Sequence, residues 1–475
     1  MKGSQTIIKV VIVLFAISQV HWISREKGIG FFQITNSPIL KSGWKVKFDG
    51  SSSSPIIANG VLYVGSSDGA LYAYDPNTGN QMWQAQTGSG QTSGPNVITV
   101  PEGTDLSKQI ETGISNQRKF NRKKEIQSTP VYNNGTVYVG SEDFSFYAFD
   151  ARSGEVKWTF PTNGGIDKKA IILDSSVFIV SKDGLLYAID ELSGQKKWDF
   201  ESFPGAKTWE ENHLPPPGHP NQLRIENGSV FVANWIRGEF KTFFSAIRAD
   251  SGIAKWNLSF EGWDAAEHLV VNGLAFISYE TRGKTKGNRY ARVVAVDADS
   301  GDIKWEFQQA ITEHGFKAID VADNALYFET GTTFHALDML TGTVLWQFEL
   351  TPKLSGLLYR KSAYIEDFVY LINDGKLHAL DPATGEEKWS FKVGKESHVE
   401  KIRGSAIYIL DGKSIKALNL KTGDKIWSFN ANTFIASKPL FHNDMIYFTT
   451  KSLTYFGVER NDQGYLYAIS AATSK

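Results

Sequence analysis

The sequence predicts an all-β protein, a β-propeller built from four-stranded blades. The first observation is a motif, Leu/Val/Phe-Tyr-Ala-x-Asp-x-x-Ser/Thr-Gly-x-x-x-Trp, which recurs with variations along the 475 residues. The second is its period, because the four shortest intervals between successive motif tryptophans are 38, 40, 41 and 43 residues. The third is the alternation of apolar and polar residues between turns, which indicates half-buried strands. Four-stranded units of this length repeated around a ring describe a propeller.

The first repeat unit shows how the residues define four strands. Asn59 and Gly60 form a dipeptide typical of a two-residue hairpin turn, because both residues accept a positive φ. Around this turn and the next two, the unit divides into alternating apolar segments at 53–58, 61–66, 70–75 and 82–86. Later units repeat this division, so each is expected to form one blade.

Each motif contains a turn and a docking ring. The Asp carboxylate accepts N–H bonds from the turn, and the Gly takes a positive φ. The Trp begins the fourth strand, where a large ring with one N–H suits a seam between neighbouring sheets. Two motifs are degenerate, with Arg248 and Asn419 at the Asp position. We expect the following tryptophans to dock blade against blade: Trp83, Trp158, Trp198, Trp256, Trp305, Trp346, Trp389 and Trp427.

The two ends of the repeat region complement each other. The last copy, at 464–474, stops before its Gly and Trp, whereas residues 43–48 look like an isolated outer strand with Trp44 as its docking ring. Pairing these segments closes the ring through an N-terminal outer strand and removes two exposed sheet edges. Eight complete units and one composite unit give nine blades by count.

The Ala-x-Asp-x-x-Thr-Gly-x-x-x-Trp signature resembles the tryptophan-docking repeat of the pyrroloquinoline-quinone-type β-propellers. The resemblance covers roughly residues 44–475 and implies the propeller fold. It also implies eight blades, the usual upper size, so we expect eight although the repeats count to nine. This superfamily includes quinoprotein alcohol dehydrogenases and non-catalytic propeller proteins of outer-membrane assembly, and the chain resembles the second group more.

Composition narrows the classes of function. Lys and Arg number 50 against 51 Asp and Glu, so the formal charge of -1 gives no general attraction to nucleic acid. The chain has no cysteine, which excludes disulfides, thiolate nucleophiles, c-type haem attachment and a lipidated N-terminal cysteine. For the dehydrogenase group, the resemblance implies a quinone that is held over Ca²⁺ against a vicinal disulfide. This disulfide cannot form in a chain without cysteine. We expect no cofactor and no metal, with pyrroloquinoline quinone and calcium as the alternative.

An apolar run, Val10–Ile17, follows two lysines near the N-terminus. It is shorter than the roughly 20 residues that a spanning helix needs, so we expect a cleaved export signal. An uncleaved signal-anchor and a buried N-terminal strand are the alternatives. We expect a periplasmic, cell-envelope or secreted protein, in which the N-terminus would provide any membrane association. The predicted divisions are a signal or anchor at 1–24, a linker at 25–42 and one propeller domain at 43–475.

The insertions into the basic unit fall on one face of the predicted ring. Strand alternation places second-to-third turns and blade-to-blade connections on that face, with insertions at 87–126, 201–221, 235–242 and 280–290. A scaffold elaborated on one face presents that face to its ligand. We expect a protein partner on that face and a monomeric chain. The alternative is that the insertions arose by neutral sequence drift and form solvated loops. Candidate partner-binding residues are Arg118, Lys119, Arg122, Lys123, Lys124, Trp209, His213 and Trp263.

Chemistry would be confined to the residues that open each blade, which converge at the hub. Ser53 and Ser128 are among them, and the Glu-His pairs at 267–268 and 313–314 could ligate a metal or act as acid and base. Adjacent strand residues point to opposite faces, so one of each pair can face the hub. A solvated polar channel is the simpler interpretation. The catalytic candidates are His268, His314 and Lys317.

We expect an exported, non-catalytic scaffold for binding or assembly. No Gly-rich phosphate loop, HExxH motif or nucleophile elbow occurs in the sequence, and a fold alone does not define an activity. One alternative is a quinone- or metal-dependent oxidoreductase with an atypical site. The other is a glycan-binding propeller in which Trp209, Trp235 and Trp263 stack on sugar rings.

Overall fold

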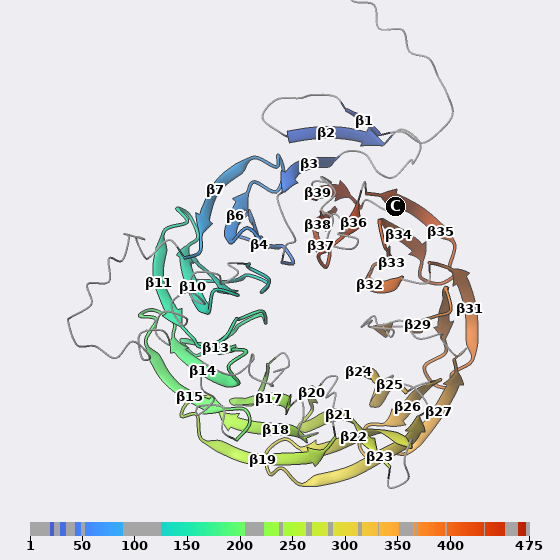
Figure 1. Cartoon of the computed structure of the whole chain (residues 1–475). Coiled ribbons are helices and arrows are strands. Elements are labelled where there is room, and N and C mark those ends of the chain that lie inside the picture. The colour runs from blue at the N-terminus through green and yellow to red at the C-terminus, as the bar shows by residue number, and fades with distance from the viewer. Residues whose placement is uncertain are drawn as a thin grey trace, which may run out of the picture.

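Nine antiparallel sheets form a ring in the computed structural model, counted over the residues that the structure describes: eight have four strands, and the ninth has seven (Figure 1). These residues are 20–22, 29–34, 43–48, 53–88, 125–204, 223–236, 241–262, 268–283, 288–311, 316–330, 332–350, 364–365, 368–394, 397–431, 433–451 and 464–471. Nine is the number that the repeats give, one more than the resemblance implies. Each complete unit forms its own sheet, and the two ends form a ninth instead of completing an eighth.

Blades 1 to 4 follow one another along the chain, each with its first strand innermost (Figure 1). Blade 1 is β4 (Ile56–Ala58), β5 (Val61–Gly65), β6 (Ala70–Tyr74) and β7 (Gln81–Gln86). Blade 2 is β8 (Val131–Asn133), β9 (Thr136–Ser141), β10 (Ser145–Asp150) and β11 (Val156–Pro161). Blade 3 is β12 (Ile171–Leu173), β13 (Ser176–Val180), β14 (Leu185–Asp190) and β15 (Lys196–Glu201). Blade 4 is β16 (Arg224–Glu226), β17 (Ser229–Ile236), β18 (Lys241–Arg248) and β19 (Ala254–Glu261).

Blades 5 to 8 continue the same order around the ring. Blade 5 is β20 (His268–Val271), β21 (Leu274–Arg282), β22 (Arg289–Asp297) and β23 (Ile303–Ile311). Blade 6 is β24 (Phe316–Ala322), β25 (Ala325–Thr330), β26 (Thr333–Asp338) and β27 (Val344–Glu349). Blade 7 is β28 (Tyr364–Ile365), β29 (Val369–Asn373), β30 (Lys376–Leu380) and β31 (Glu387–Lys392). Blade 8 is β32 (His398–Arg403), β33 (Ala406–Asp411), β34 (Ser414–Asn419) and β35 (Lys425–Asn430).

The ninth, composite blade joins the two ends of the repeat region. Its strands are β37 (Leu440–His442), β38 (Met445–Lys451), β39 (Gly464–Ser470) and β3 (Gly43–Phe48), and β36 (Phe434–Ile435) also pairs with β38. Trp44 pairs with Ala468 in the register of β3 and β39, which confirms closure of the ring by an N-terminal outer strand. Two further strands, β2 (Ile29–Ile34) and β1 (Val20–Trp22), continue this sheet outward from β3.

A row of three side chains crosses every blade. In blade 1, Tyr63 pairs with Ala73, and Ala73 pairs with Trp83 on the next strand. Because the alanine is small, the two rings meet across it with centroids 5.8 Å apart. The nine equivalent ring pairs have centroids 5.7–6.2 Å apart. The alanine of the motif therefore makes room for the aromatic pair of its own blade.

The motif turns form the seams between blades. Trp256 of blade 4 lies on Gly301 of blade 5, where a Cβ would approach its ring to 2.6 Å. The Trp256 Nε1–H donates to the Ala298 carbonyl at 3.1 Å. The Asp297 carboxylate fixes the turn by accepting the backbone N–H groups of residues 299 and 300, both at 3.0 Å. Eight tryptophans stand against such a glycine: Trp44, Trp83, Trp158, Trp198, Trp256, Trp305, Trp346 and Trp389.

A lysine precedes the docking tryptophan on five outer strands: Lys157, Lys197, Lys255, Lys304 and Lys388. Lys304 pairs with Asp297 of its own motif turn at 3.1 Å, and three others pair in the same way. In blade 4, where Arg248 replaces the Asp, Lys255 instead reaches Asp299 of the next blade at 2.7 Å. These lysines place positive charges on the outer strands of five blades.

Candidate interaction face

The second-to-third turns and the blade-to-blade connections define the loop face of the ring. Both ends of the longest insertion are held at this face by blade 1. The Thr87 N–H and hydroxyl donate to the Gly69 carbonyl at 2.8 and 2.9 Å. The Ile126 N–H donates to the Ser66 carbonyl at 2.9 Å, and its buried side chain packs over Gly65, where a Cβ would approach it to 2.3 Å. The insertion therefore leaves from the face expected from the sequence.

A second motif, Ser-x-Asp-x-x-x-Tyr, occupies the loop face of blades 1, 2 and 3. In each blade the Asp accepts the backbone N–H two residues later with one oxygen, at 2.9–3.1 Å. Its other oxygen accepts the tyrosine hydroxyl at 2.6–2.9 Å, and the Ser hydroxyl accepts the Asp N–H. The three sets are Ser66, Asp68 and Tyr72; Ser141, Asp143 and Tyr147; and Ser181, Asp183 and Tyr187.

The motif in blade 3 is the most buried of the three. Asp183 is 6% exposed, and burial raises the pKa of its carboxyl, although hydrogen bonds from its neighbours oppose this effect. Burial, together with the Asp183 charge, raises the pKa of Tyr187 well above its usual range. Tyr187 therefore remains a neutral donor to Asp183 near neutral pH, and the hydrogen bond between them supports the turn.

The same tyrosine position ties neighbouring blades together. The Tyr147 hydroxyl of blade 2 accepts the N–H of Gly88, the last described residue before the insertion, at 2.9 Å. On the other side of the insertion, the Glu142 N–H donates to the Glu125 carbonyl at 2.9 Å. Blades 1 and 2 thus hold both ends of the insertion through hydrogen bonds from backbone and side-chain groups.

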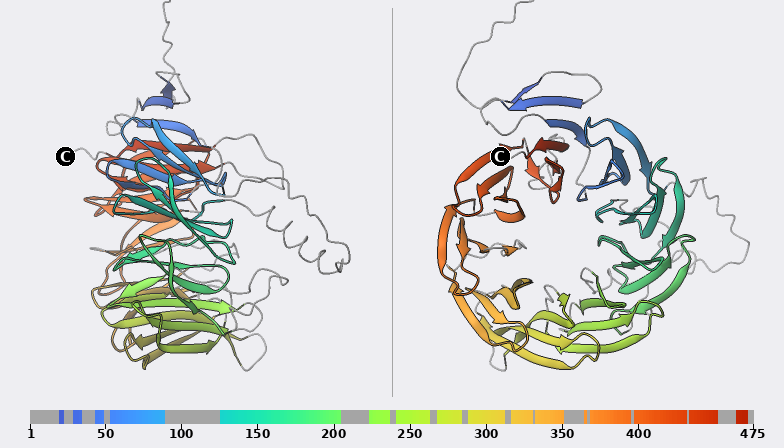
Figure 2. Two further views of the ribbon diagram at one scale, coloured as in Figure 1. Left: turned by 90° about the vertical axis from the view of Figure 1, so that its left-hand side faces the viewer. Right: turned by 180° about the vertical axis from the view of Figure 1, so that it is seen from behind.

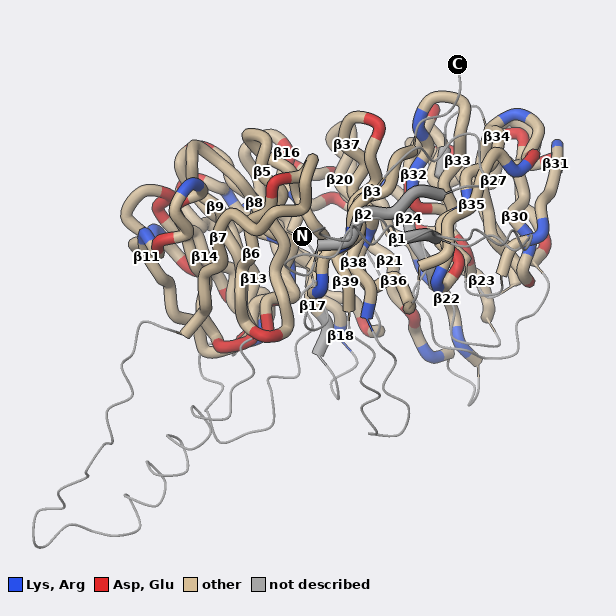
Figure 3. The backbone as a smooth tube through the Cα atoms, turned by 90° about the horizontal axis from the view of Figure 1, so that it is seen from above, with Lys and Arg blue, Asp and Glu red and all other residues tan. Residues whose placement is uncertain are grey.

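Charged side chains link blades 2 and 3 on the loop face. The Lys182 ammonium pairs with Glu142 of blade 2 and with Asp167 at 3.4 Å, and Lys168 also pairs with Asp167 at 3.6 Å. Burial lowers the pKa of Lys182, but the two carboxylates outweigh burial and raise it above its ordinary value. Over the described residues, acidic and basic segments are interspersed along the turns of both faces (Figure 3).

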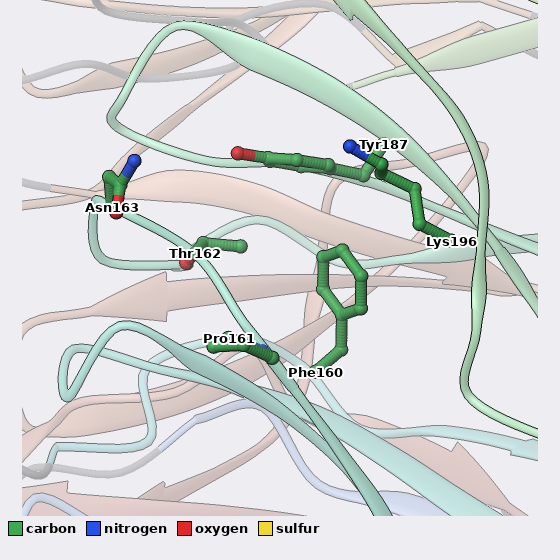
Figure 4. Close-up of a pocket in the computed structure, with 6 residues that line it drawn as sticks. All are labelled: Phe160, Pro161, Thr162, Asn163, Tyr187 and Lys196. Carbon is green, nitrogen blue, oxygen red and sulfur yellow. The ribbon is translucent and has the colours of Figure 1, made fainter.

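A hollow of about 330 Å³ lies between blades 2 and 3 beside this network (Figure 4). Phe160 and Tyr187 form its aromatic walls, with ring centroids 5.3 Å apart. The Asn163 N–H at its edge donates to Asp183 at 3.0 Å, and Lys196 pairs with Asp199 at 2.8 Å. Most polar groups around the hollow are thus already used within the fold.

At the hub, two of the described blade-opening residues, Ser53 and Ser128, bond to the backbone of their own blades. The Ser128 hydroxyl exchanges hydrogen bonds with the backbone of Gly140 on the second strand, at 2.7 and 2.9 Å. Ser53 accepts the Gly65 N–H at 2.8 Å in the same way. Both serines are buried, so the blade-opening serines close the first and second strands together.

His268 is buried against Phe244 of the preceding blade, with ring centroids 5.5 Å apart. Burial, and then the charge of Arg224, lowers the pKa of His268 to about 3. The imidazole is therefore neutral at physiological pH. Lys317 lies in β24 with its backbone alone described, and His314 lies outside the described residues. A catalytic role for these residues stays a prediction.

The candidate partner-binding residues also lie outside the described residues: Arg118, Lys119, Arg122, Lys123, Lys124, Trp209, His213 and Trp263. Trp235 lies in β17 with its backbone alone described. Sequence reasoning missed the Ser-x-Asp-x-x-x-Tyr motif that fixes the base of the insertion. Its signal is present in the sequence as SSDGALY, SEDFSFY and SKDGLLY, which directly precede three of the tryptophan-docking turns.

The described residues contain no group of three or more His, Asp or Glu side chains placed to hold a metal ion. The chain also lacks the cysteines of a vicinal disulfide. Among the described residues, the side chains therefore do not fit the calcium site that the resemblance implies, and the vicinal disulfide beside the quinone has no counterpart in the sequence. Within the described part of the chain, no helix has the length and apolar character to cross a membrane.

The ring, its docking tryptophans and its closure by an N-terminal strand define a propeller of pyrroloquinoline-quinone-type repeats. The family described as "Outer membrane protein assembly factor BamB" matches residues 41–102, 96–208 and 204–475. Because these matches cover most of the sequence, the chain belongs to this family.

Individual relatives match over parts of their length. Outer membrane protein assembly factor BamB of Burkholderia pseudomallei (strain K96243) is 30% identical over 124 residues, 23% of this chain and 30% of the relative. Quinohemoprotein alcohol dehydrogenase ADH-IIG of Pseudomonas putida is 22% identical over 378 residues, 69% of this chain and 51% of the relative. The chain therefore spans less than a third of the first protein and about half of the second.

A solved structure shares the fold. The chain superimposes on a europium-containing methanol dehydrogenase with a TM-score of 0.52 and 13% identity. The match covers 89% of this chain and 92% of the dehydrogenase. At this identity the likeness shows the propeller fold alone.

Proposed function

We propose that the protein is an exported, non-catalytic scaffold that acts in outer membrane protein assembly by binding a protein partner at its loop face. Membership of the assembly-factor family supports this class of function. The absence of cysteine supports a role without the quinone chemistry of the dehydrogenase relatives. Placement in the cell envelope is part of the proposal, as is a monomeric chain.

The observation that carries the proposal is the anchoring of the longest insertion. Gly88 and Glu125, the described residues at its two ends, bond to Tyr147 and Glu142 of blade 2. A loop with both ends fixed on a rigid base can present contact residues with little loss of conformational entropy at the base. The basic run at 118–124 immediately precedes Glu125, so we assign it to partner contact.

The experiment neutralises this basic run and asks whether a partner is lost. In the loop variant, Arg118, Lys119, Arg122, Lys123 and Lys124 become Ser. In the matched control, five exposed lysines far from the insertion in the sequence become Ser: Lys376, Lys392, Lys401, Lys421 and Lys425. Both variants lose five positive charges, so a difference between them reports position and not net charge.

Tagged wild-type chain and both variants are used to capture partners from an envelope fraction, with partners identified by mass spectrometry after crosslinking. We expect the loop variant to lose at least nine-tenths of the partner that wild type and control retain. Circular dichroism checks that all three chains are folded. Equal capture by the loop variant and the control would reject the assignment.

An oxidoreductase is the second candidate, favoured by the alignment over 378 residues with ADH-IIG. It is tested by adding pyrroloquinoline quinone and Ca²⁺ to the purified chain and following dye-linked alcohol oxidation. Saturable quinone binding with turnover would replace the scaffold proposal.

A further inference from the structure

We infer that the outer edge of β3 is a strand-acceptor site, which the chain's own β2 fills and which a partner's extended, uncharged segment can occupy by β-augmentation. This site lies on the rim of the composite blade and is separate from the loop face. The inference therefore goes beyond the proposed function and does not depend on the basic insertion.

The structure contains the pairing that such a partner would make. β2 runs antiparallel to β3, with Ile29 opposite Val46 and Phe32 opposite Gly43. In the other eight blades the fourth strand is the last strand of its sheet among the described residues. The composite blade is therefore the place where the rim accepts an additional strand.

The ring does not need β2 for closure. β3 already completes the composite blade, and Trp44 docks on Gly79 with its Nε1–H bonded to the Pro76 carbonyl at 2.9 Å. Both ring views place β1 and β2 outside the circle of blades (Figures 1 and 2). Replacement of β2 by another strand would therefore leave all nine blades intact.

The part of β3 that pairs with β2 has no exposed lysine, whereas five other outer strands carry a lysine before the docking tryptophan. Edge strands are commonly guarded by outward-pointing lysines. Gly43 stands where five other blades carry the lysine before the docking tryptophan. Lys45 is only 6% exposed, and its ammonium lies 4.5 Å from the centroid of the Tyr465 ring. Its charge is therefore directed over an aromatic ring of its own sheet.

Burial distinguishes β3 from the other outer strands, and its pairing with β2 sets the length of the acceptor edge. Five of the six β3 residues are buried, whereas the other outer strands have at most two buried residues. Lys47 is the exposed residue of β3, and it lies just beyond Val46, the last residue paired with β2. The acceptor edge thus covers four residues and ends at a charge.

The chemistry of β2 defines the partner. Its sequence, IGFFQI, contains no charge, no proline and mostly apolar or aromatic residues. Backbone pairing supplies affinity in β-augmentation, and alternate side chains supply specificity. The matching partner is a protein with an extended, uncharged, aromatic-rich segment, such as a strand that has not yet joined its own sheet.

The test uses the full chain and a fluorescent peptide of residues 28–35 (GIGFFQIT) as the added strand. The variant Gly30→Pro/Phe31→Pro changes two neighbouring residues of β2, whose N–H groups point to opposite sides of the strand. Whichever of them donates to β3 loses its donor, because proline cannot donate to a ladder. The matched control Asn36→Pro/Ser37→Pro places two prolines beyond the paired residues. We expect the first variant to bind the peptide at least tenfold more tightly than the wild type and the control.

Hydrogen exchange of the segment 43–48 separates the outcomes. Its amide protons should exchange faster in Gly30→Pro/Phe31→Pro and regain protection when the peptide binds. The inference is overturned if this variant shows no faster exchange, or if exchange rises and the peptide neither binds nor restores protection. A strand-exchanged dimer without peptide binding, seen by sedimentation, would overturn the partner assignment. The loop variant described above should leave peptide binding unchanged, so the two proposals fail independently.

Discussion

A single methyl group can measure how strongly tryptophan docking holds two blades together. Gly301 has φ +80°, and a Cβ there would lie 2.6 Å from Trp256 Cγ. Gly301→Ala therefore adds two costs, a left-handed backbone of about 1–2 kcal/mol and a steric overlap of about 1–3 kcal/mol, typical of an overpacked core. The steric overlap should weaken the contact between blades 4 and 5.

Gly273 provides a control in the same blade. It has φ +75°, but a Cβ there would meet no atom within 4 Å. Gly273→Ala thus adds only the cost of the left-handed backbone. The difference in free energy of unfolding between the two variants therefore isolates the contact with Trp256. We expect Gly301→Ala to lose about 1–3 kcal/mol more free energy of unfolding, measured from urea transitions followed by far-UV circular dichroism. Equal losses in the two variants would show that the ring does not constrain the turn and would refute this account of the seam.

Two further predictions concern the seams and the hub. Trp305→Phe should lower the free energy of unfolding by about 1 kcal/mol more than Trp427→Phe. The reason is that Trp305 Nε1 donates to the Met339 carbonyl at 3.0 Å, whereas Trp427 Nε1 has no partner within the described structure. Urea unfolding of both variants measures the difference. His268 has its pKa lowered to about 3, so its unfolded form binds a proton that the folded form does not between roughly pH 6.5 and 3. The wild type should therefore lose stability relative to His268→Leu as pH falls through this window, by up to about 1.4 kcal/mol per pH unit, and parallel stability profiles would contradict the assignment.

The ring was predictable because its determinants are local and repeated. The Asp, Gly and Trp of each motif lie within a few residues of one another, so the sequence shows both the turn and the docking ring. Closure was also predictable, since Trp44 and the truncated copy at 464–474 each lacked what the other supplied. The blade number followed the repeats and not the resemblance, because each unit forms its own sheet.

The loop-face contacts were harder to predict because they join residues far apart in the sequence. The bond between Gly88 and Tyr147 spans 59 residues, and that between Lys182 and Glu142 spans 40. Neither pair follows from strand periodicity. The hydrogen bonds of Ser128 were equally hidden, because its partner Gly140 lies on the second strand and no sequence pattern links the two residues.

The propeller separates stability from function in a specific way. Each seam depends on contacts between neighbouring blades, such as Trp256 on Gly301, so an insertion in one connection leaves the other seams unchanged. The motif polar groups are used within their own turns, as Asp297 shows. A binding surface therefore disturbs the fold least where it uses segments that lie outside the repeat. The anchored insertion on the loop face and the additional strand β2 on the rim both lie outside the repeat, which is why we propose recognition at these two places and not at the hub.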